Sequence, residues 1–331
     1  MPTVLFTPEE LLHVEAEHTE ILEAAGFEVV YPKNPLFTRG NSGEEESIVE
    51  LSVADAVIAG SEFITARMLD KLPRMRVIAR SGVGYDRVDV PAATARNIVV
   101  TITPTAVHEA ASEHALALLF AVSKRIVVRD RATRNGGWPR DLVEPIRRKT
   151  IGILGLGRIG RSMAIRSSAM GMKVIAHDVA ADQTFAAANQ VELVDFDSLI
   201  DHCDVLSIHC PVTDVTRGII NREVFARMKP NAIVINTSRG AVINEADLVT
   251  ALRERRIQGA GLDVYEKEPP AGDNPLFELD NVVLSPHAAS GDWLAMQDMA
   301  TEAARCIIQL HQAQWPAGAV INQELAGQWK W

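Results

Sequence analysis

The sequence contains little cysteine. Three cysteines occur among 331 residues, and no two of them form a Cys-x-x-Cys pair. Disulfide-stabilised domains usually carry an even, closely spaced set of cysteines. We therefore expect a protein that folds without a disulfide framework in a reducing compartment.

Long hydrophobic runs are also missing. The longest strongly apolar stretch covers residues 115–122, whereas a membrane-spanning helix needs roughly 20 apolar residues. The first ten residues lack the basic region and apolar core of a signal peptide. We expect a cytoplasmic location and no membrane partner.

Positive charge is in deficit. The chain has 33 lysines and arginines against 43 aspartates and glutamates, a net charge of −10. Nucleic-acid partners favour a basic surface, so we expect none. Small anions remain possible ligands, because local donors bind them whatever the net charge. The hydrophobic share of 47% is that of a soluble globular protein, and the length suits about two domains.

Short β-prone runs alternate with helical segments along almost the whole chain. Helices are expected at residues 9–25, 66–72, 107–135, 158–170 and 292–312. The expected strands are residues 3–6, 27–30, 55–60, 76–82, 151–154, 173–176, 204–209, 232–236, 259–263 and 282–284. This alternation predicts an α/β fold with doubly wound parallel sheets.

A glycine-rich turn begins the second series of strands. Gly155, Gly157 and Gly160 have the spacing GxGxxG between an apolar strand and a helical stretch. In such a turn the first glycine permits a tight bend, the second lets a pyrophosphate approach, and the third lets helix and strand pack closely. The helix N-terminus offers free N–H groups to the phosphates. The motif in this context predicts a dinucleotide site.

An acidic residue follows at the end of the next expected strand. Asp178 lies near the roughly 20-residue spacing at which such sites place a carboxylate on the adenosine ribose. A carboxylate there repels a 2′-phosphate, and no arginine follows within residues 179–182. The sequence therefore favours NAD as cofactor, with NADP less favoured.

Five blocks of sequence carry a wider resemblance. They read RSGVGYDRVDV, ILGLGRIG, LSIHCPVTDVTRGIIN, INTSRGAVINEADLVTALRERRIQGAGLDVYEKEPP and NVVLSPHAAS, and they span residues 77–290. In this order the blocks resemble the D-2-hydroxyacid dehydrogenases, and the longest block is the most specific. The resemblance implies hydride transfer between NAD and a small anionic 2-oxo or 2-hydroxy acid.

The resemblance also implies three catalytic residues. Arg239 would anchor the substrate carboxylate through its planar guanidinium. His287 would transfer the proton, because an imidazole has a reference pKa of about 6.5. A carboxylate beside it favours the charged ring and fixes which nitrogen faces the substrate. By charge alone Glu266 could take that place; the family phasing selects Glu268.

The remaining site residues are implied in the same way. Backbone N–H groups of Val83 and Gly84 would bind the substrate carboxylate, and those of Arg158 and Ile159 the pyrophosphate. The residues expected beside the nicotinamide are Cys210, Thr237, Ser238 and Asp263, the last of which would bind the carboxamide. All of them lie at carboxyl ends of expected strands, where doubly wound sheets bind ligands. The histidines elsewhere lack metal-ligand spacing, so we expect no metal.

The family's own range leaves the substrate open. Phosphoglycerate enzymes tend to have an arginine where this chain has Gly60, which reduces the weight of that substrate without excluding it. We expect a hydroxypyruvate- or glyoxylate-type substrate, or a phosphoglycerate-type one. Formate oxidation is disfavoured because that group typically has glutamine at Glu268. A different class is an NAD-sensing binding protein similar to the family's corepressors.

These inferences define the expected architecture. We expect two Rossmann-like domains with parallel sheets. A smaller, flavodoxin-like substrate domain would be formed by residues 1–102 and 290–331, and the larger NAD-binding domain, residues 103–289, would be inserted in it. The long, alanine-containing helix near residues 107–135 suits packing against a second copy, so a homodimer is expected. Trp138 would either pack in that interface or reach the partner's site.

Overall fold

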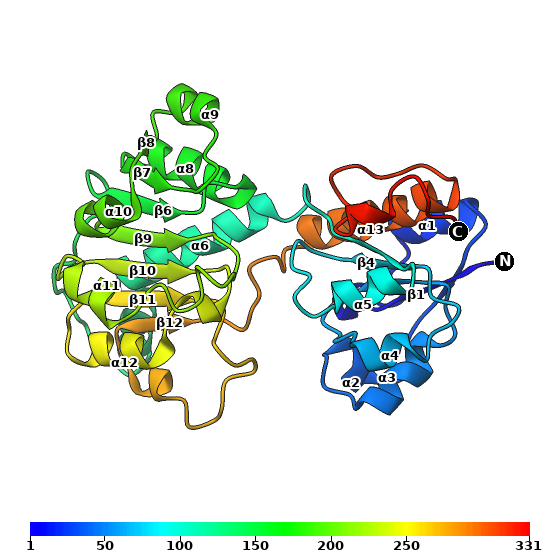
Figure 1. The fold of residues 1–331 in the computed structure, drawn as a ribbon. Coiled ribbons are helices and arrows are strands. Elements are labelled where there is room, and N and C mark those ends of the chain that lie inside the picture. Colours follow the sequence, from blue (N-terminus) through cyan, green and yellow to red (C-terminus); the bar gives the residue numbers. More distant parts are fainter. The chain divides into compact units, whose positions relative to one another are not determined.

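The computed structural model describes residues 1–331, and the chain folds into two compact units. The first unit consists of Met1–Val107 and Gly291–Trp331, and the second of His108–Ser290 (Figure 1). The sequence places the boundaries at residues 102 and 290, whereas the first unit continues to Val107 and resumes at Gly291. The first unit is therefore discontinuous, with the second inserted in it.

The first unit contains a five-stranded parallel sheet in the order β2-β1-β3-β4-β5. Its strands are β1 (Thr3–Phe6), β2 (Glu28–Val30), β3 (Ala56–Ala59), β4 (Val77–Arg80) and β5 (Val99–Thr101). This order is that of flavodoxin-like folds. Every residue of β1, β3 and β4 is buried, as expected for strands covered on both faces.

The helices of the first unit differ from expectation at its beginning. They are α1 (Glu17–Ala24), α2 (Pro35–Thr38), α3 (Glu44–Leu51), α4 (Ala66–Leu69), α5 (Val90–Ala95) and α13 (Trp293–His311), with a 3₁₀ turn at Glu9–Leu11 and another at Gln323–Leu325. The single helix expected over residues 9–25 is wrong, because His13 adopts a left-handed backbone (φ 59°) that separates the 3₁₀ turn from α1. α13 packs against α1 and β4 and returns the end of the chain to this unit.

The second unit contains a seven-stranded parallel sheet in the order β12-β11-β10-β9-β6-β7-β8. Its strands are β6 (Thr150–Leu154), β7 (Lys173–His177), β8 (Glu192–Leu193), β9 (Val205–Ile208), β10 (Ile233–Asn236), β11 (Gly259–Leu262) and β12 (Val282–Leu284). Counted from β6, the order is that of the Rossmann fold with one added edge strand. The fold class predicted from the sequence is confirmed in both units.

The helix expected over residues 107–135 is broken. The second unit has α6 (His108–Ser123), α7 (Ile126–Arg134), α8 (Arg158–Ala169), α9 (Gln183–Ala188), α10 (Phe196–His202), α11 (Arg222–Arg227) and α12 (Glu245–Arg253), with 3₁₀ turns at Gly240–Val242 and Pro275–Glu278. Arg125 separates α6 from α7 because it adopts a left-handed backbone (φ 53°). Its Nη1 donates to Asp141 at 2.8 Å, which holds the break in place.

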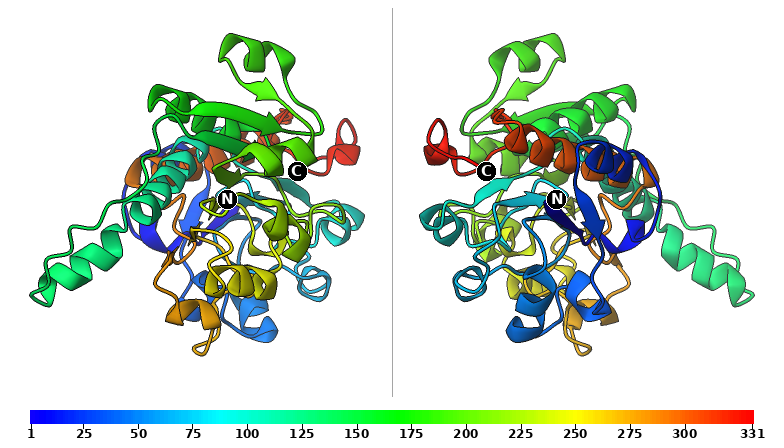
Figure 2. Two further views of the ribbon diagram at one scale, coloured as in Figure 1. Left: turned by 90° about the vertical axis from the view of Figure 1, so that its left-hand side faces the viewer. Right: turned by 90° about the vertical axis from the view of Figure 1, so that its right-hand side faces the viewer.

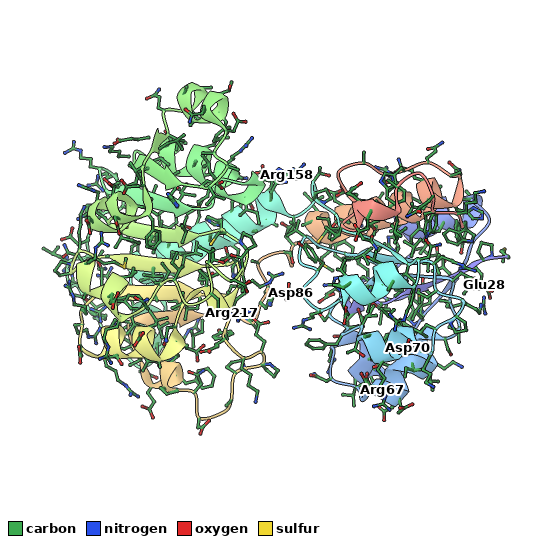
Figure 3. All side chains as sticks on the ribbon, viewed as in Figure 1. Glu28, Arg67, Asp70, Asp86, Arg158 and Arg217 are labelled. Atoms are coloured by element: carbon green, nitrogen blue, oxygen red, sulfur yellow. The ribbon has the colours of Figure 1, made fainter.

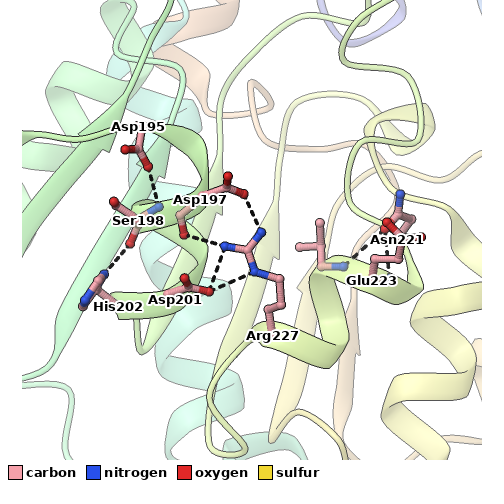
Figure 4. A network of polar contacts seen from close by, with 9 residues as sticks. Asp195, Asp197, Ser198, Asp201, His202, Asn221, Glu223 and Arg227 are labelled. Atoms are coloured by element: carbon pink, nitrogen blue, oxygen red, sulfur yellow. Dashed lines mark hydrogen bonds and ion pairs between the residues drawn. The ribbon is translucent and has the colours of Figure 1, made fainter.

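The outer face of the second unit carries a polar network between α10 and α11 (Figure 4). Arg227 Nε donates to Asp201 Oδ1 at 3.0 Å, and the same guanidinium also binds Asp197. Asp195 caps α10 by accepting the N–H of Ser198 at 2.6 Å. The Arg227 contacts join the two surface helices, whereas the Asp195 cap belongs to α10 alone. No helix of either unit combines the length and apolar character needed to cross a membrane.

Candidate active site

The candidate residues of the second unit line up along one edge of its sheet. His287 follows β12, Asp263 follows β11, and Thr237 to Arg239 follow β10. Cys210, Gly155 and Asp178 follow β9, β6 and β7. Because neighbouring strands are parallel, these carboxyl ends lie at the same edge in the order of the sheet. The strand order reverses between β6 and β9, the point at which such sheets bind ligands.

The glycine-rich turn joins β6 to α8. Gly155 has φ +97°, and a Cβ there would lie 2.7 Å from the backbone nitrogen of Cys210. A Cβ on Gly160 would lie 2.1 Å from the carbonyl oxygen of Gly155. Both positions therefore require glycine, the first for its backbone conformation and the second because helix and strand approach so closely.

The space beside Gly157 is open, in contrast to the other two glycines. A Cβ at Gly157 would have no atom within 4 Å. Arg158, labelled in Figure 3, begins α8, and the N–H groups of Arg158 and Ile159 have no hydrogen-bond partner. Free N–H groups at the start of a twelve-residue helix favour an anion. The turn therefore has the open space and the donors that a pyrophosphate needs.

Asp178, directly after β7, hydrogen-bonds to the glycine-rich turn. Its Oδ2 accepts the N–H of Leu156 at 2.6 Å, and its Oδ1 accepts the N–H of Ala180 at 2.7 Å. A carboxylate has about four acceptor positions, so each oxygen retains one for a ribose hydroxyl. The half-buried Asp178 thus lies against the glycine-rich turn, where the sequence expects the ribose.

The end of β10 is shaped by a residue that the sequence argument missed. Asn236 is fully buried; its Oδ1 accepts the N–H of Ser238 at 3.0 Å, and its Nδ2 donates to the carbonyl of Arg239 at 2.9 Å. Arg239 Nη1 in turn donates to the carbonyl of Ser238 at 2.7 Å. The buried Oγ1 of Thr237 has no partner. Asn236 therefore shapes the loop that presents the arginine.

Gly240 brings Arg239 next to another loop. A Cβ at Gly240 would lie 1.9 Å from the carbonyl carbon of Tyr265. Only glycine allows this contact, so the arginine loop packs directly on the turn that leads from β11 to Glu268. The reason for glycine is this close approach, and its backbone φ is not in the left-handed region.

His287 and Glu268 are paired. His287 Nδ1 lies 2.7 Å from Glu268 Oε2, and Glu268 Oε1 accepts the N–H of Tyr265 at 3.2 Å. The His287 side chain is 43% exposed, so Nε2 of the same ring can meet a ligand. Glu266, the alternative by charge, is exposed, and its backbone N–H donates to Glu245. Geometry places Glu268 against the imidazole.

Asp263 lies directly behind His287 and is fully buried. Its Oδ1 accepts Ser285 Oγ at 2.5 Å and the N–H of Ala288 at 2.9 Å, while its Oδ2 accepts the N–H of Ala289 at 2.9 Å. Oδ2 therefore accepts one hydrogen bond within the protein and has one further acceptor position. Ser285 was missed by the sequence argument, which had no signal for it beyond its place after β12.

In the first unit, the loop after β4 contains Val83 and Gly84. Neither N–H has a hydrogen-bond partner, and both residues are half-buried. The buried Arg80 holds this loop: its Nε donates to the carbonyl of Gly84 at 3.1 Å and its Nη1 to that of Ala59 at 3.1 Å. The N–H groups of Val83 and Gly84 are therefore unpaired donors on a loop that Arg80 holds in place.

The sequence pattern of the D-isomer specific 2-hydroxyacid dehydrogenase NAD binding domain matches residues 116–289, just over half of the chain. The chain belongs to the D-isomer specific 2-hydroxyacid dehydrogenase family. The glyoxylate reductase of Thermofilum pendens is 40% identical over 290 residues, which cover 85% of this chain and 85% of that protein. The family match lies within the second unit, and it confirms NAD as the cofactor.

Other relatives of this chain differ from it in length. The D-3-phosphoglycerate dehydrogenase of Archaeoglobus fulgidus is 40% identical over 263 residues, which cover 78% of this chain but 50% of that protein. The chain thus spans about half the length of that relative. Among solved structures, a protein of Thermus thermophilus has a TM-score of 0.85 at 31% identity, with 96% of this chain and 100% of that chain covered.

Proposed function

We propose that the protein interconverts a D-2-hydroxy acid and a 2-oxo acid by NAD-dependent hydride transfer. The 2.7 Å pair of His287 Nδ1 and Glu268 Oε2 carries this proposal. A carboxylate on Nδ1 stabilises the imidazolium and leaves Nε2 to give its proton to the substrate carbonyl oxygen. In the reverse direction the neutral ring accepts the hydroxyl proton. A positioned acid of this kind contributes about 10²–10⁴ in rate.

Arg239 is proposed to bind the substrate carboxylate and to polarise the carbonyl. Its guanidinium presents several donors in one plane, which suits a two-point contact with a carboxylate. Asn236 and Gly240 support it by fixing the loop on which it stands. The free N–H groups of Val83 and Gly84 are proposed as further donors to a carboxylate. Each of these groups stabilises negative charge without giving up a proton.

The cofactor is proposed to lie on the glycine-rich turn, with Arg158 and Ile159 donating to its pyrophosphate. Bound NADH supplies the hydride. Asp178 is proposed to accept the ribose hydroxyls and Asp263 the carboxamide, and Cys210, Thr237 and Ser238 to line the nicotinamide side. Burial raises the pKa of the Cys210 thiol to about 11, so this group stays neutral and contributes shape.

The substrate class is tested by a panel of 2-oxo acids with NADH and NADPH side by side. Glyoxylate, hydroxypyruvate, pyruvate, longer 2-oxo acids and phosphohydroxypyruvate are included, because the relatives described above are named for glyoxylate or phosphoglycerate. Oxidation of NADH with at least one of them is expected. Tight NAD binding with no turnover on any member would contradict the proposal and favour the NAD-sensing alternative.

The roles of the two glutamates are tested by a matched pair of variants. Glu268→Gln removes the charge beside His287 and is expected to lower kcat by about 100-fold or more, because the imidazolium loses its stabilising carboxylate. Glu266→Gln changes the same residue type two positions away and is expected to leave kcat unchanged. Equal effects of the two changes would remove Glu268 from its role.

Cofactor choice is tested at Asp178. Asp178→Ala is expected to weaken NADH binding more than NADPH binding, since the lost carboxylate binds ribose hydroxyls but repels a 2′-phosphate. Dissociation constants for both cofactors are measured by nicotinamide fluorescence. An unchanged ratio of the two constants would argue against the ribose role.

A homodimer is proposed through α7 and its flanks. No residue of α7 is buried, and Ile126, Trp138 and Leu142 are exposed. Figure 2 shows this segment extending away from the sheet of its own unit. Large apolar side chains on an extended arm suit burial against a second copy. Light scattering is expected to give the mass of two chains, and Leu142→Asp with Trp138→Asp to give one.

A further inference from the structure

Helix α6 packs closely on strand β11, and glycines in the strand make this possible. A Cβ at Gly259 would lie 2.9 Å from Val122 Cγ1, and one at Gly261 would lie 2.9 Å from Leu118 Cβ. Side chains on either strand residue would push the helix away. The sequence "GAGL" is therefore what allows α6 to pack directly on this strand.

The alignment of α6 on β11 brings a third pair of residues together, beyond Val122 with Gly259 and Leu118 with Gly261. Val122, Leu118 and His114 are spaced by four residues and share one face of α6. Gly259 and Gly261 alternate along β11, and Asp263, directly after the strand, continues the same face. Four helical residues rise about 6 Å and two strand residues about 6.6 Å, so the two rows stay in step. His114, one turn before Leu118 in the helix, therefore lies opposite Asp263, two residues after Gly261.

That third pair is a polar contact. His114 Nε2 lies 2.8 Å from Ser285 Oγ and 3.3 Å from Asp263 Oδ1. Ser285 Oγ lies 2.5 Å from the same Asp263 oxygen. An ionised carboxylate only accepts, so Ser285 donates to Asp263 and accepts the N–H of His114. The hydrogen bonds run in one direction, from His114 through Ser285 to Asp263.

Asp263 in turn binds the loop that carries His287. The N–H of His287 donates to the backbone carbonyl of Asp263 at 2.8 Å, and the N–H groups of Ala288 and Ala289 donate to its carboxylate. His287 adopts a left-handed backbone (φ 54°), which is costly for any residue other than glycine. One aspartate therefore holds three consecutive N–H groups and the conformation between them.

We propose that His114 is a positioning residue that acts through Ser285 and Asp263 to hold the backbone of His287. His114 does not touch the substrate or the reacting atoms. It orients Ser285, Ser285 and the loop N–H groups orient the Asp263 carboxylate, and the carboxylate fixes the loop so that the imidazole faces Glu268. The catalytic consequence rests on the proposed function, but the structural consequence does not.

The experiment uses three variants of the full chain. His114→Leu removes the Nε2 donor. His114→Gln keeps an N–H donor at a similar distance along the side chain. His108→Leu is the matched control, because His108 is also on α6 with a side chain 29% exposed against 26% for His114. His108 contacts Glu109 and takes no part in the network.

The first measurement is amide hydrogen exchange of residues 287–289, which needs no activity. His114→Leu is expected to speed exchange of these amides by about 10-fold or more, since they are held through Asp263. His114→Gln is expected to restore most of the protection, and His108→Leu to leave it unchanged. Unchanged protection in His114→Leu would overturn the proposal.

The second measurement is the kinetics of 2-oxo acid reduction. His114→Leu is expected to lower kcat by roughly 10- to 100-fold with little change in KM for NADH, because orientation of the acid is lost while the cofactor turn is intact. His114→Gln should recover most of kcat. A loss confined to KM, or no recovery with glutamine, would contradict the positioning role. Wild-type protein without turnover but with the expected exchange pattern would refute the proposed function alone.

Discussion

Two buried acids show how differently this protein treats a carboxyl group. Asp263, in the second unit, and Glu62, in the first, have 0% and 1% of their surface exposed. The Asp263 carboxylate accepts hydrogen bonds from Ser285, Ala288 and Ala289. The two oxygens of Glu62 have no hydrogen-bond partner. Burial is the same, but for Glu62 the cost of burial outweighs the stabilisation of its charge by Thr7 and Arg80.

The difference has a physical origin in the neighbouring backbone. Asp263 stands where a loop turns and presents successive N–H groups to it. Glu62 follows Gly60 at the end of β3, where the nearby Arg80 donates to the carbonyls of Ala59, Gly60 and Gly84. Burial raises the pKa of Glu62 to about 7. A buried carboxylate without donors is costly, whereas one with donors organises its surroundings.

The largest effect is expected from Asp263→Ala. The change leaves Ser285 and the N–H groups of Ala288 and Ala289 without their acceptor, and we expect a loss of roughly 3–5 kcal/mol in the free energy of unfolding. Urea unfolding measures it. Asp280→Ala, which removes an exposed partner of Arg255, is the control and should cost about 1 kcal/mol or less. A loss of unfolding free energy no larger than that of the control would show that the Asp263 carboxylate does not organise its surroundings.

Glu62→Gln is expected to stabilise the protein in neutral and basic solution. The folded-state pKa is about 7 and the ordinary value 4.5, so between these values the folded chain keeps a proton that the unfolded chain releases. The stability of the wild type therefore falls as pH rises through this window, by up to about 3 kcal/mol, and levels off above it.

Glutamine does not titrate, so the variant should lack this decline. Melting temperatures of both proteins from about pH 4.5 to pH 8 test the point. The two curves should be close at the acid end and separate steadily towards neutral pH. Parallel curves across the whole range would show that Thr7 and Arg80 stabilise the charged form of Glu62 enough to offset its burial.

A smaller effect is expected from Thr7→Val. The buried Oγ1 of Thr7 accepts the N–H of Gly60 at 3.0 Å and donates to the carbonyl of Ile58 at 3.0 Å, so it is engaged by backbone next to Glu62. Valine has nearly the same shape and leaves that N–H unpaired, at a cost of about 1–2 kcal/mol in unfolding free energy. The exposed Thr184→Val in α9 serves as the control, with an expected change within about 0.5 kcal/mol.

The smallest effect on stability is expected from Thr237→Val. Its buried Oγ1 has no partner, like the oxygens of Glu62, so removing the hydroxyl should change unfolding free energy by less than about 1 kcal/mol. Under the proposed function it lies beside the nicotinamide, and we expect KM for NADH to rise while stability holds. A stability loss as large as that of Thr7→Val would mean that the hydroxyl has a structural partner.

Much of the second unit could be predicted from local patterns. The strands that end at Leu154, Asn236 and Leu284 are apolar runs with clear boundaries, and the glycine spacing located the turn after β6. The first unit was harder: β5, α2 and α3 were not anticipated, because short elements carry little periodic signal. The break at Arg125 was missed for a different reason. It depends on a backbone conformation that Asp141 stabilises from sixteen residues away.

Local patterns in the chain predict the alternation of strands and helices, the glycine-rich turn with Asp178, and the family blocks that single out Arg239, Glu268 and His287. These signals are local in the chain. Tertiary packing alone establishes that Gly240 serves a close contact with Tyr265 and that His114 reaches Asp263. Such facts depend on helix–strand register and on backbone donors arriving from distant segments, and no local pattern encodes them.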